Sequence, residues 1–279
     1  MLLGLIIAEE ISIIITYQKM VINMVEIPII KNVFSKSLNE RIDTMATYIC
    51  SDLHGNYNVW HEIKKFLKKE DKLICLGDVI DRGPAGYSIL VEMLGDPRVT
   101  LLMGNHEDMM VAACDSYIKY ETDNTHEISL WTHHNGGSCT FEDWQLDPGR
   151  MEVLEQVRNL PLSMEITNNW GRNLILTHAG CNSEQFHYGC LKKEDLLWDR
   201  FHYHLVWDGR EEDIVIHGHT PMAKMHGWPD FVPVKALWYS SNHKVCIDCL
   251  TAFTNFTILL NVDTFEEHII GEPIEEVLW

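Results

Sequence analysis

The 279-residue sequence predicts an α/β fold in which short buried strands alternate with amphipathic helices. Five short, nearly continuous apolar runs have the length and composition of central strands, because a strand with one exposed face would alternate apolar and polar residues. Segments with apolar residues at helical spacing follow several of these runs. Every run also ends in a short cluster of Asp, Asn or His beside Gly, which is the third observation.

The predicted strands and helices follow one another in a regular order. The first run is followed by Val59, Ile63 and Leu67 at helical spacing, which predicts an amphipathic crossover helix. Similar spacing predicts helices over 87–94 and 108–114. The chain therefore repeats strand, polar loop and helix. The five predicted strands are 48–50, 73–76, 99–103, 174–176 and 214–216.

The polar clusters at the ends of these strands carry the chemistry. Each alone is weak, because Asp, Asn and His beside Gly are common in turns. In layered α/β folds, however, the loops at the carboxyl ends of strands converge, so we expect the five clusters to meet in one crevice. They read Asp52-Leu53-His54-Gly55, Gly77-Asp78-Val79-Ile80-Asp81-Arg82-Gly83, Gly104-Asn105-His106-Glu107, His178-Ala179-Gly180 and His217-Gly218-His219-Thr220.

These residue types indicate a catalytic metal site. Carboxylate, imidazole and carboxamide without thiolate suit Mn²⁺, Fe or Zn²⁺, and argue against a closed structural zinc site. There are more candidate ligands than a single catalytic ion with open coordination positions can use, so two ions are predicted, with Asp78 as the carboxylate that bridges them. Two ions roughly 3.5–4 Å apart polarise a phosphoryl oxygen and activate water, which predicts hydrolysis at phosphorus. The candidate ligands are Asp52, His54, Asp78, Asn105, His178 and His219.

The ordered clusters resemble the metallophosphoesterase superfamily and, within it, the phosphoprotein phosphatase family. Asp81-Arg82-Gly83 after Gly77-Asp78 supports the narrower resemblance, which is strongest to the compact bacterial and bacteriophage members. Trp131 followed by Asn135-Gly136-Gly137, and the segment 197–200, resemble motifs of those members. Covering about 48–263, the resemblance implies a calcineurin-like four-layer α/β/β/α sandwich with a dimetal site at the carboxyl ends of the strands.

The resemblance also implies roles for individual residues. His106 would be the general acid that protonates the leaving oxygen, with Asp81 orienting its imidazole. Arg82 and Arg200 would bind the non-bridging phosphoryl oxygens. Mn²⁺ is the first choice of metal, with Fe or Zn²⁺ as alternatives. One ion would be held by Asp52, His54 and Asp78, and the other by Asp78, Asn105, His178 and His219.

Two departures from the family pattern lie in the first motif and at the rim of the site. Ser51 stands where the family usually has glycine, and Ile247-Asp248 is followed by 249–253 without the usual glycine. His217 and His219 compete for one ligand role, and the resemblance favours His219, because the ligand in the family follows a small residue, here Gly218.

Other candidate groups have simpler interpretations. Glu107 is expected to be structural. His133 and His134 follow no apolar run and are expected in a loop or at the surface, whereas Cys246 and Cys249 are expected as two buried strand thiols. Four lysines at 64, 65, 68 and 69 are interpreted as the solvated face of the crossover helix.

Composition limits the partners. The formal net charge of −19 opposes attraction to nucleic acid or anionic membranes, so neither is expected as a partner. The 8 cysteines are scattered through predicted strands and helices, which suits a reducing cytoplasm better than a disulfide framework. The sequence does not predict an oligomeric state.

The predicted metallophosphoesterase domain is 45–279, preceded by an N-terminal extension, 1–44, of unassigned structure. Segment 2–8 is apolar but lacks a basic n-region and is too short to span a bilayer. Met45 directly precedes the first predicted strand, and a start there would leave every motif intact. We therefore expect deletion of 1–44 to preserve activity.

Three functions fit these observations. The leading one is a metal-dependent phosphomonoesterase acting on phosphoserine or phosphothreonine proteins, with phosphotyrosine as a further substrate. The second is hydrolysis of dinucleoside polyphosphates such as diadenosine tetraphosphate. The third is a non-catalytic binding module, which the intact Asp81, His106, Arg82 and Arg200 disfavour, because a purely structural protein needs no acid or phosphate-binding arginines.

Overall fold

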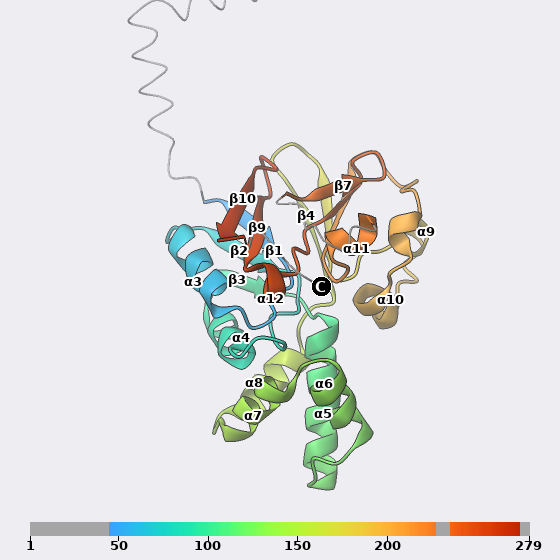
Figure 1. Cartoon of the computed structure of the whole chain (residues 1–279). Coiled ribbons are helices and arrows are strands. Elements are labelled where there is room, and N and C mark those ends of the chain that lie inside the picture. Colours follow the sequence, from blue (N-terminus) through green and yellow to red (C-terminus); the bar gives the residue numbers. More distant parts are fainter. Residues whose placement is uncertain (1–44, 227–234, 274–279) are drawn as a thin grey trace, which may run out of the picture. The chain divides into compact units, whose positions relative to one another are not determined.

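The computed structural model describes residues 45–226 and 235–273, which contain two five-stranded mixed sheets (Figure 1). The predicted extension 1–44 lies outside the described residues. Within them, no helix has both the length and the apolar character needed to cross a bilayer.

The first sheet has the strand order β10-β9-β1-β2-β3. Its strands β1, β2 and β3 are parallel, and β9 and β10 extend the sheet in antiparallel fashion. The register pairs Cys50 of β1 with Cys75 of β2, so these two strands end side by side. The strands are β1 (Thr47–Cys50), β2 (Lys72–Cys75), β3 (Val99–Leu101), β9 (Phe256–Asn261) and β10 (Glu267–Gly271).

The second sheet has the order β4-β5-β6-β8-β7. Its three central strands are parallel and its two edge strands are antiparallel to their neighbours. The strands are β4 (Ser163–Thr167), β5 (Asn173–Thr177), β6 (Asp213–His217), β7 (Leu237–Tyr239) and β8 (Lys244–Cys246).

The predicted helices are confirmed, and further helices follow them. The crossover helix is α3 (Tyr57–Phe66), which begins where the Asn56 side chain accepts a hydrogen bond from the Val59 amide at 3.2 Å and which buries Val59, Trp60 and Ile63. The other helices are α4 (Gly86–Gly95), α5 (Asn105–Tyr120), α6 (His126–His134), α7 (Ser138–Leu146), α8 (Arg150–Arg158), α9 (Ser183–His187), α10 (Lys193–Trp198), η1 (His202–His204, a 3₁₀ helix), α11 (Met222–His226) and α12 (Thr251–Thr254).

Three apolar clusters show that these elements form four layers. Ile49 and Ile74 of the first sheet pack against Leu176 and Ile216 of the second, so the two sheets face each other. The opposite face of the first sheet packs on α3, α4 and α5, and the opposite face of the second packs around Trp207. Figure 1 shows α3 and α4 on one side of the strands and α9 and α10 on the other. The α/β/β/α sandwich is therefore confirmed.

Candidate metal centre

The carboxyl ends of five strands bring the predicted ligands together. The loops after β1, β2 and β3 of one sheet and after β5 and β6 of the other supply all six predicted ligands, which are 95% or more buried. Strands that end side by side deliver these residues from positions up to 167 residues apart. The five polar clusters therefore meet in one place, as expected.

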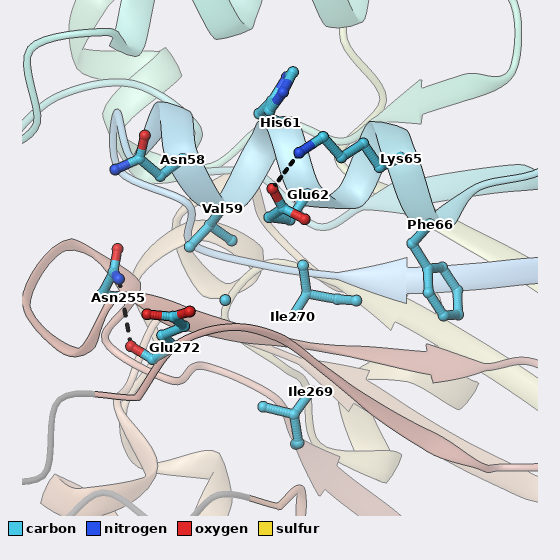
Figure 2. Close-up of a pocket in the computed structure, with 11 residues that line it drawn as sticks. Asn58, Val59, His61, Glu62, Lys65, Phe66, Asn255, Ile269, Ile270 and Glu272 are labelled. Carbon is cyan, nitrogen blue, oxygen red and sulfur yellow. Dashed lines mark hydrogen bonds and ion pairs between the residues drawn. The ribbon is translucent and has the colours of Figure 1, made fainter.

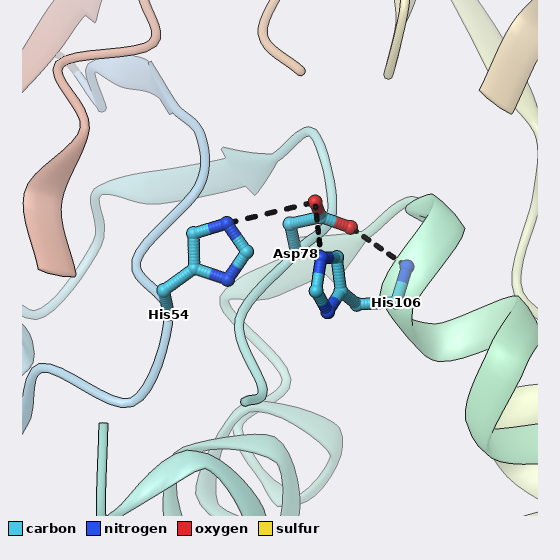
Figure 3. Close-up of side chains that lie close together, drawn as sticks. All are labelled: His54, Asp78 and His106. Atoms are coloured by element: carbon cyan, nitrogen blue, oxygen red, sulfur yellow. Dashed lines mark hydrogen bonds and ion pairs between the residues drawn. The ribbon is translucent and has the colours of Figure 1, made fainter. Parts of the chain in front are cut away.

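One cluster contains His54, Asp78 and His106 (Figure 3), whose ligand atoms lie within 4.8 Å of one another. Asp78 Oδ2 is 3.7 Å from His54 Nε2 and 3.8 Å from His106 Nε2. Asp52, which the sequence assigns to this position, has Oδ1 3.9 Å from His54 Nε2. The structure therefore adds His106 to the residues near the first predicted ion.

A second cluster contains Asp78, His178 and His219. Asp78 Oδ1 is 3.4 Å from His178 Nε2, so the two oxygens of this carboxylate face different clusters. Asn105 Oδ1 lies 2.9 Å from both His178 Nε2 and His219 Nδ1. This is the arrangement expected for a bridging Asp78 beside the second predicted ligand set.

The histidine rings are held so that one nitrogen faces each cluster. Nδ1 of His54 lies 3.0 Å from the carbonyl oxygen of Ile80, and Nδ1 of His178 lies 2.9 Å from that of Leu76. A neutral ring satisfies such a carbonyl by donating from Nδ1, which leaves the Nε2 lone pair for a cation. The Nε2 atom of His219 is buried and has no hydrogen-bond partner.

The electrostatics also favour a bound cation. Although burial opposes ionisation, His178 and His106 hold the pKa of Asp78 well below its usual value. Burial likewise opposes protonation of His178, but Asp78 raises its pKa to about 9. The buried Asp78 carboxylate therefore requires a positive neighbour, and a bound divalent ion would supply that charge in place of the imidazole proton. Donor types, ring orientation and charge all fit the predicted metals.

The backbone of the site is strained. Six of the ten predicted site residues have a positive φ, between 44° and 70°, a region that non-glycine residues seldom adopt. Such conformations cluster at active sites, where the surrounding structure maintains them. The six are Asp52, His54, Asp78, Asp81, Arg82 and His219.

His106 and Asp81 form a buried pair beside the first cluster. His106 Nδ1 lies 2.6 Å from Asp81 Oδ2, and the same oxygen accepts a hydrogen bond from Trp131 Nε1 at 2.6 Å. Burial lowers the pKa of His106, but Asp78 and Asp81 outweigh it and raise the pKa above its usual value. The sequence singled out Trp131 only as part of a motif, and the structure shows what the indole contacts.

The two predicted phosphate-binding arginines lie at different sides of the centre. Arg82 places Nη1 2.7 Å from His54 Nε2 and Nη2 3.2 Å from His106 Nε2. Its backbone amide donates to the carbonyl of Gly136 at 2.9 Å, which explains how the Asn-Gly-Gly motif reaches the site. Arg200 Nη1 donates to Thr220 Oγ1 at 3.0 Å, next to His219.

Glu107 supports the loops and does not face the clusters. Its carboxylate accepts hydrogen bonds from the backbone amides of Asp78, Val79 and Gly104, at 2.8–2.9 Å. Gly104 is required here because a Cβ would lie 2.2 Å from Asp78 Oδ1. Burial raises the pKa of Glu107 to about 7.

The two departures from the family pattern have structural counterparts. Ser51 donates a short hydrogen bond to Asp52 Oδ2, so the residue in place of glycine contacts a predicted ligand. In the glycine-free segment, Leu250 adopts a left-handed conformation with φ 58°, and its amide donates to the buried Asp248 at 2.8 Å. The chain keeps a glycine-like turn at this rim at the cost of backbone strain.

The remaining candidates lie away from the clusters. His217 is buried, with Nε2 2.7 Å from the Tyr239 hydroxyl, and only His219 of the two competing histidines joins a cluster. His133 and His134 are exposed at the end of α6. Cys246 and Cys249 are buried free thiols as expected, but β8 ends at Cys246, so the placement of Cys249 in a strand is wrong.

Comparison with known protein families identifies the chain. The profile described as calcineurin-like phosphoesterase matches residues 45–247, a stretch that contains all ten predicted site residues. The chain belongs to the calcineurin-like metallophosphoesterase family. This family acts on phosphoesters, in agreement with the reaction class that the ligand set predicts.

Two relatives of this metallophosphoesterase carry the names of different activities. It is 29% identical over 162 residues to serine/threonine-protein phosphatase 2 of Escherichia coli (strain K12), covering 54% of this chain and 66% of that protein. It is 30% identical over 141 residues to the symmetrical bis(5'-nucleosyl)-tetraphosphatase of Acidovorax ebreus (strain TPSY), covering 49% of this chain and 44% of that protein. Each match spans less than two thirds of the relative.

A solved structure supports the fold. A protein provisionally described as a diadenosine tetraphosphatase superposes with a TM-score of 0.57 at 14% identity, over 82% of this chain and 95% of that one. At this identity the likeness concerns the fold alone.

Proposed function

We propose that this metallophosphoesterase hydrolyses phosphomonoesters, with phosphoserine and phosphothreonine proteins as its substrates. The observation that carries the proposal is the buried His106–Asp81 pair beside two clusters that share Asp78. A site that only bound metal or phosphate would need no such acid. When bound, two divalent ions would supply Lewis acidity and an activated water.

The chain's own residues supply the other requirements of phosphoryl transfer. Asp52, His54 and Asp78 would hold one ion, and Asp78, Asn105, His178 and His219 the other. Arg82 and Arg200 would bind the non-bridging oxygens, since a planar guanidinium donates two parallel hydrogen bonds to a phosphoryl group.

His106 would donate the proton that the leaving oxygen requires. Asp78 and Asp81 raise its pKa above the usual value despite burial, which favours the protonated imidazole, and the Asp81 carboxylate at 2.6 Å stabilises that cation. Trp131 fixes the carboxylate in turn. Because Nδ1 donates to Asp81, the transferable proton would reside at Nε2, which lies 3.8 Å from Asp78 Oδ2.

Two adjoining pockets support a protein substrate. A pocket of about 320 Å³ opens beside His54 and shares Asn58 and Asn255 with a groove of about 650 Å³ between α3 and β10 (Figure 2). The groove contains two carboxylates, Glu62 and Glu272, and one lysine, Lys65, which is paired with Glu62 at 2.7 Å.

The charge of this groove bears on the two candidate substrates. A dinucleoside polyphosphate lying along the groove would meet two carboxylates, and the one lysine of the lining is already paired. A peptide, in contrast, can hydrogen-bond to the amide side chains of the groove and pack on its apolar residues Val59, Phe66 and Ile270. Hydrolysis of diadenosine tetraphosphate is the second candidate, because relatives at about 30% identity carry that name.

One comparison of substrates tests the proposal. Purified protein loaded with Mn²⁺, Fe or Zn²⁺ in parallel should release phosphate from phosphoserine and phosphothreonine peptides with a higher kcat/KM than from diadenosine tetraphosphate. Asp78→Asn, which alters the residue shared by both clusters, is the negative control. Faster cleavage of the dinucleotide would establish the second candidate and overturn the first.

A further inference from the structure

Lys244 of β8 is an unusual buried cation. Its side chain is fully buried, and Nζ donates hydrogen bonds to the carbonyl oxygens of His202 at 2.7 Å and Leu205 at 3.1 Å. No carboxylate of residues 45–226 and 235–273 lies within 4.0 Å of this ammonium. The lysine therefore contacts backbone carbonyls in place of a counter-ion.

Stability alone does not explain such a residue. Burial of an ammonium without a carboxylate is costly, and exchange of buried charges for apolar side chains of similar volume is often neutral or stabilising. Burial lowers the pKa of Lys244 to about 8, which reflects this cost. A role in holding a particular loop accounts for the lysine better than a role in the core.

The carbonyls that Lys244 holds belong to the segment that carries Arg200. They lie in and just after η1, two and five residues beyond Arg200. The His202 ring packs edge-on against His217, with ring centroids 4.5 Å apart, and covers Gly180 so closely that a Cβ there would lie 2.3 Å from His202 Cε1. The segment therefore packs directly against the loops that carry His178 and His219.

The Arg200 side chain completes this connection. Its guanidinium donates to Thr220 Oγ1 at 3.0 Å and to the carbonyl of His219 at 3.3 Å. One end of the segment therefore rests on a predicted ligand loop, while Lys244 fixes its backbone from the core. Loss of the hydrogen bonds from Lys244 would leave the Arg200 guanidinium on a segment that is no longer anchored to the core.

We propose that Lys244 is a positioning residue that fixes segment 199–206 so that Arg200 meets the phosphoryl group. This inference rests on the proposed function through the role of Arg200. It predicts that Lys244 matters to phosphate binding only while Arg200 is present.

A double-mutant cycle tests this dependence. Arg200→Ala should lower kcat/KM by about 10- to 100-fold, the range for loss of a charge-assisted hydrogen bond. Lys244→Met should lower it by about 5- to 50-fold, chiefly through a higher KM and a weaker inhibition by inorganic phosphate. The double variant should match Arg200→Ala within about 2-fold, because coupled residues do not contribute independently.

Asp213→Asn is the matched control. Asp213 is also fully buried in the second sheet but lies at the amino end of β6, paired with Arg210 at 2.9 Å. Its effect on kcat/KM should multiply with that of Arg200→Ala. If the losses from Lys244→Met also multiply, the lysine is merely structural and the inference is wrong.

Hydrogen exchange provides a readout that does not require activity. The amides of His204 and Leu205 donate to the carbonyls of Phe201 and His202, at 3.0 and 3.1 Å, so their exchange reports the integrity of η1. Lys244→Met should speed their exchange at least 10-fold and leave the melting temperature nearly unchanged. Unchanged exchange would overturn the anchoring. A wild-type protein that cleaves no phosphoester would refute the proposed function instead, and the exchange result would then decide the anchoring alone.

Discussion

Replacement of His106 by asparagine separates proton donation from phosphate binding. The imidazole is held 2.6 Å from Asp81 with its other nitrogen toward the clusters, so the change removes the proposed acid and keeps a polar side chain. A positioned general acid contributes about 10²- to 10⁴-fold, equivalent to about 3–5 kcal/mol of barrier. The full loss applies only when the leaving group needs a proton.

Two substrates should therefore respond differently. His106→Asn should lower kcat/KM for a phosphoserine peptide by about 10²- to 10⁴-fold, and for p-nitrophenyl phosphate by less than about 10-fold, because nitrophenolate leaves without a proton. His134→Asn, at the exposed end of α6, is the control and should affect neither. Since His106 also lies near the first cluster, metal content must be measured for each variant.

The pH profile gives the same test a second readout. Asp78 and Asp81 raise the pKa of His106 above its usual value despite burial. The imidazole therefore stays protonated above pH 6.5 and loses its proton only as the pH rises through the higher pKa of the folded protein. The alkaline fall of kcat/KM on the phosphopeptide should therefore disappear in His106→Asn. Equal losses on both substrates, with metal retained, would refute the assignment.

Three further outcomes are expected. Trp131→Phe removes the hydrogen bond to Asp81 and should lower kcat for poor leaving groups by about 10-fold in steady-state kinetics on the phosphopeptide. An unchanged kcat would mean that the indole contributes packing and does not position Asp81. Glu107→Ala leaves three buried amides without their acceptor and should destabilise the fold by about 3 kcal/mol or more, a drop in melting temperature of roughly 6–12 °C; a drop of less than 2 °C would contradict this role. The net charge of −19 should make kcat/KM for a small anionic substrate rise as salt increases from very low values, and a flat or falling response would count against it.

The strands and the ligand loops could be predicted from the sequence because their signals are local. A continuous apolar run such as 174–176 identifies a strand covered on both faces, and the polar residues after it occupy its carboxyl end. The convergence of Asp52 and His219 also follows from the fold class, although 167 residues separate them.

Other features depend on contacts that carry no local pattern. Trp131 reaches Asp81 across 50 residues, and Lys244 reaches His202 across 42, so neither role can be read from neighbouring residues. The left-handed backbone at Asp78 and Arg82 is likewise maintained by the assembled structure against local preference. A glycine-free segment such as 249–253 gave no sign of the turn that Leu250 makes.

The metal content of the purified protein tests the central claim most directly. Elemental analysis of the full chain, after growth with Mn²⁺, Fe and Zn²⁺ available, should find about two transition-metal ions per chain, with anomalous scattering placing both beside Asp78. Asp78→Asn should retain fewer ions while it remains folded. A folded wild-type protein that retains no transition metal, or that binds it away from Asp78, would contradict the account.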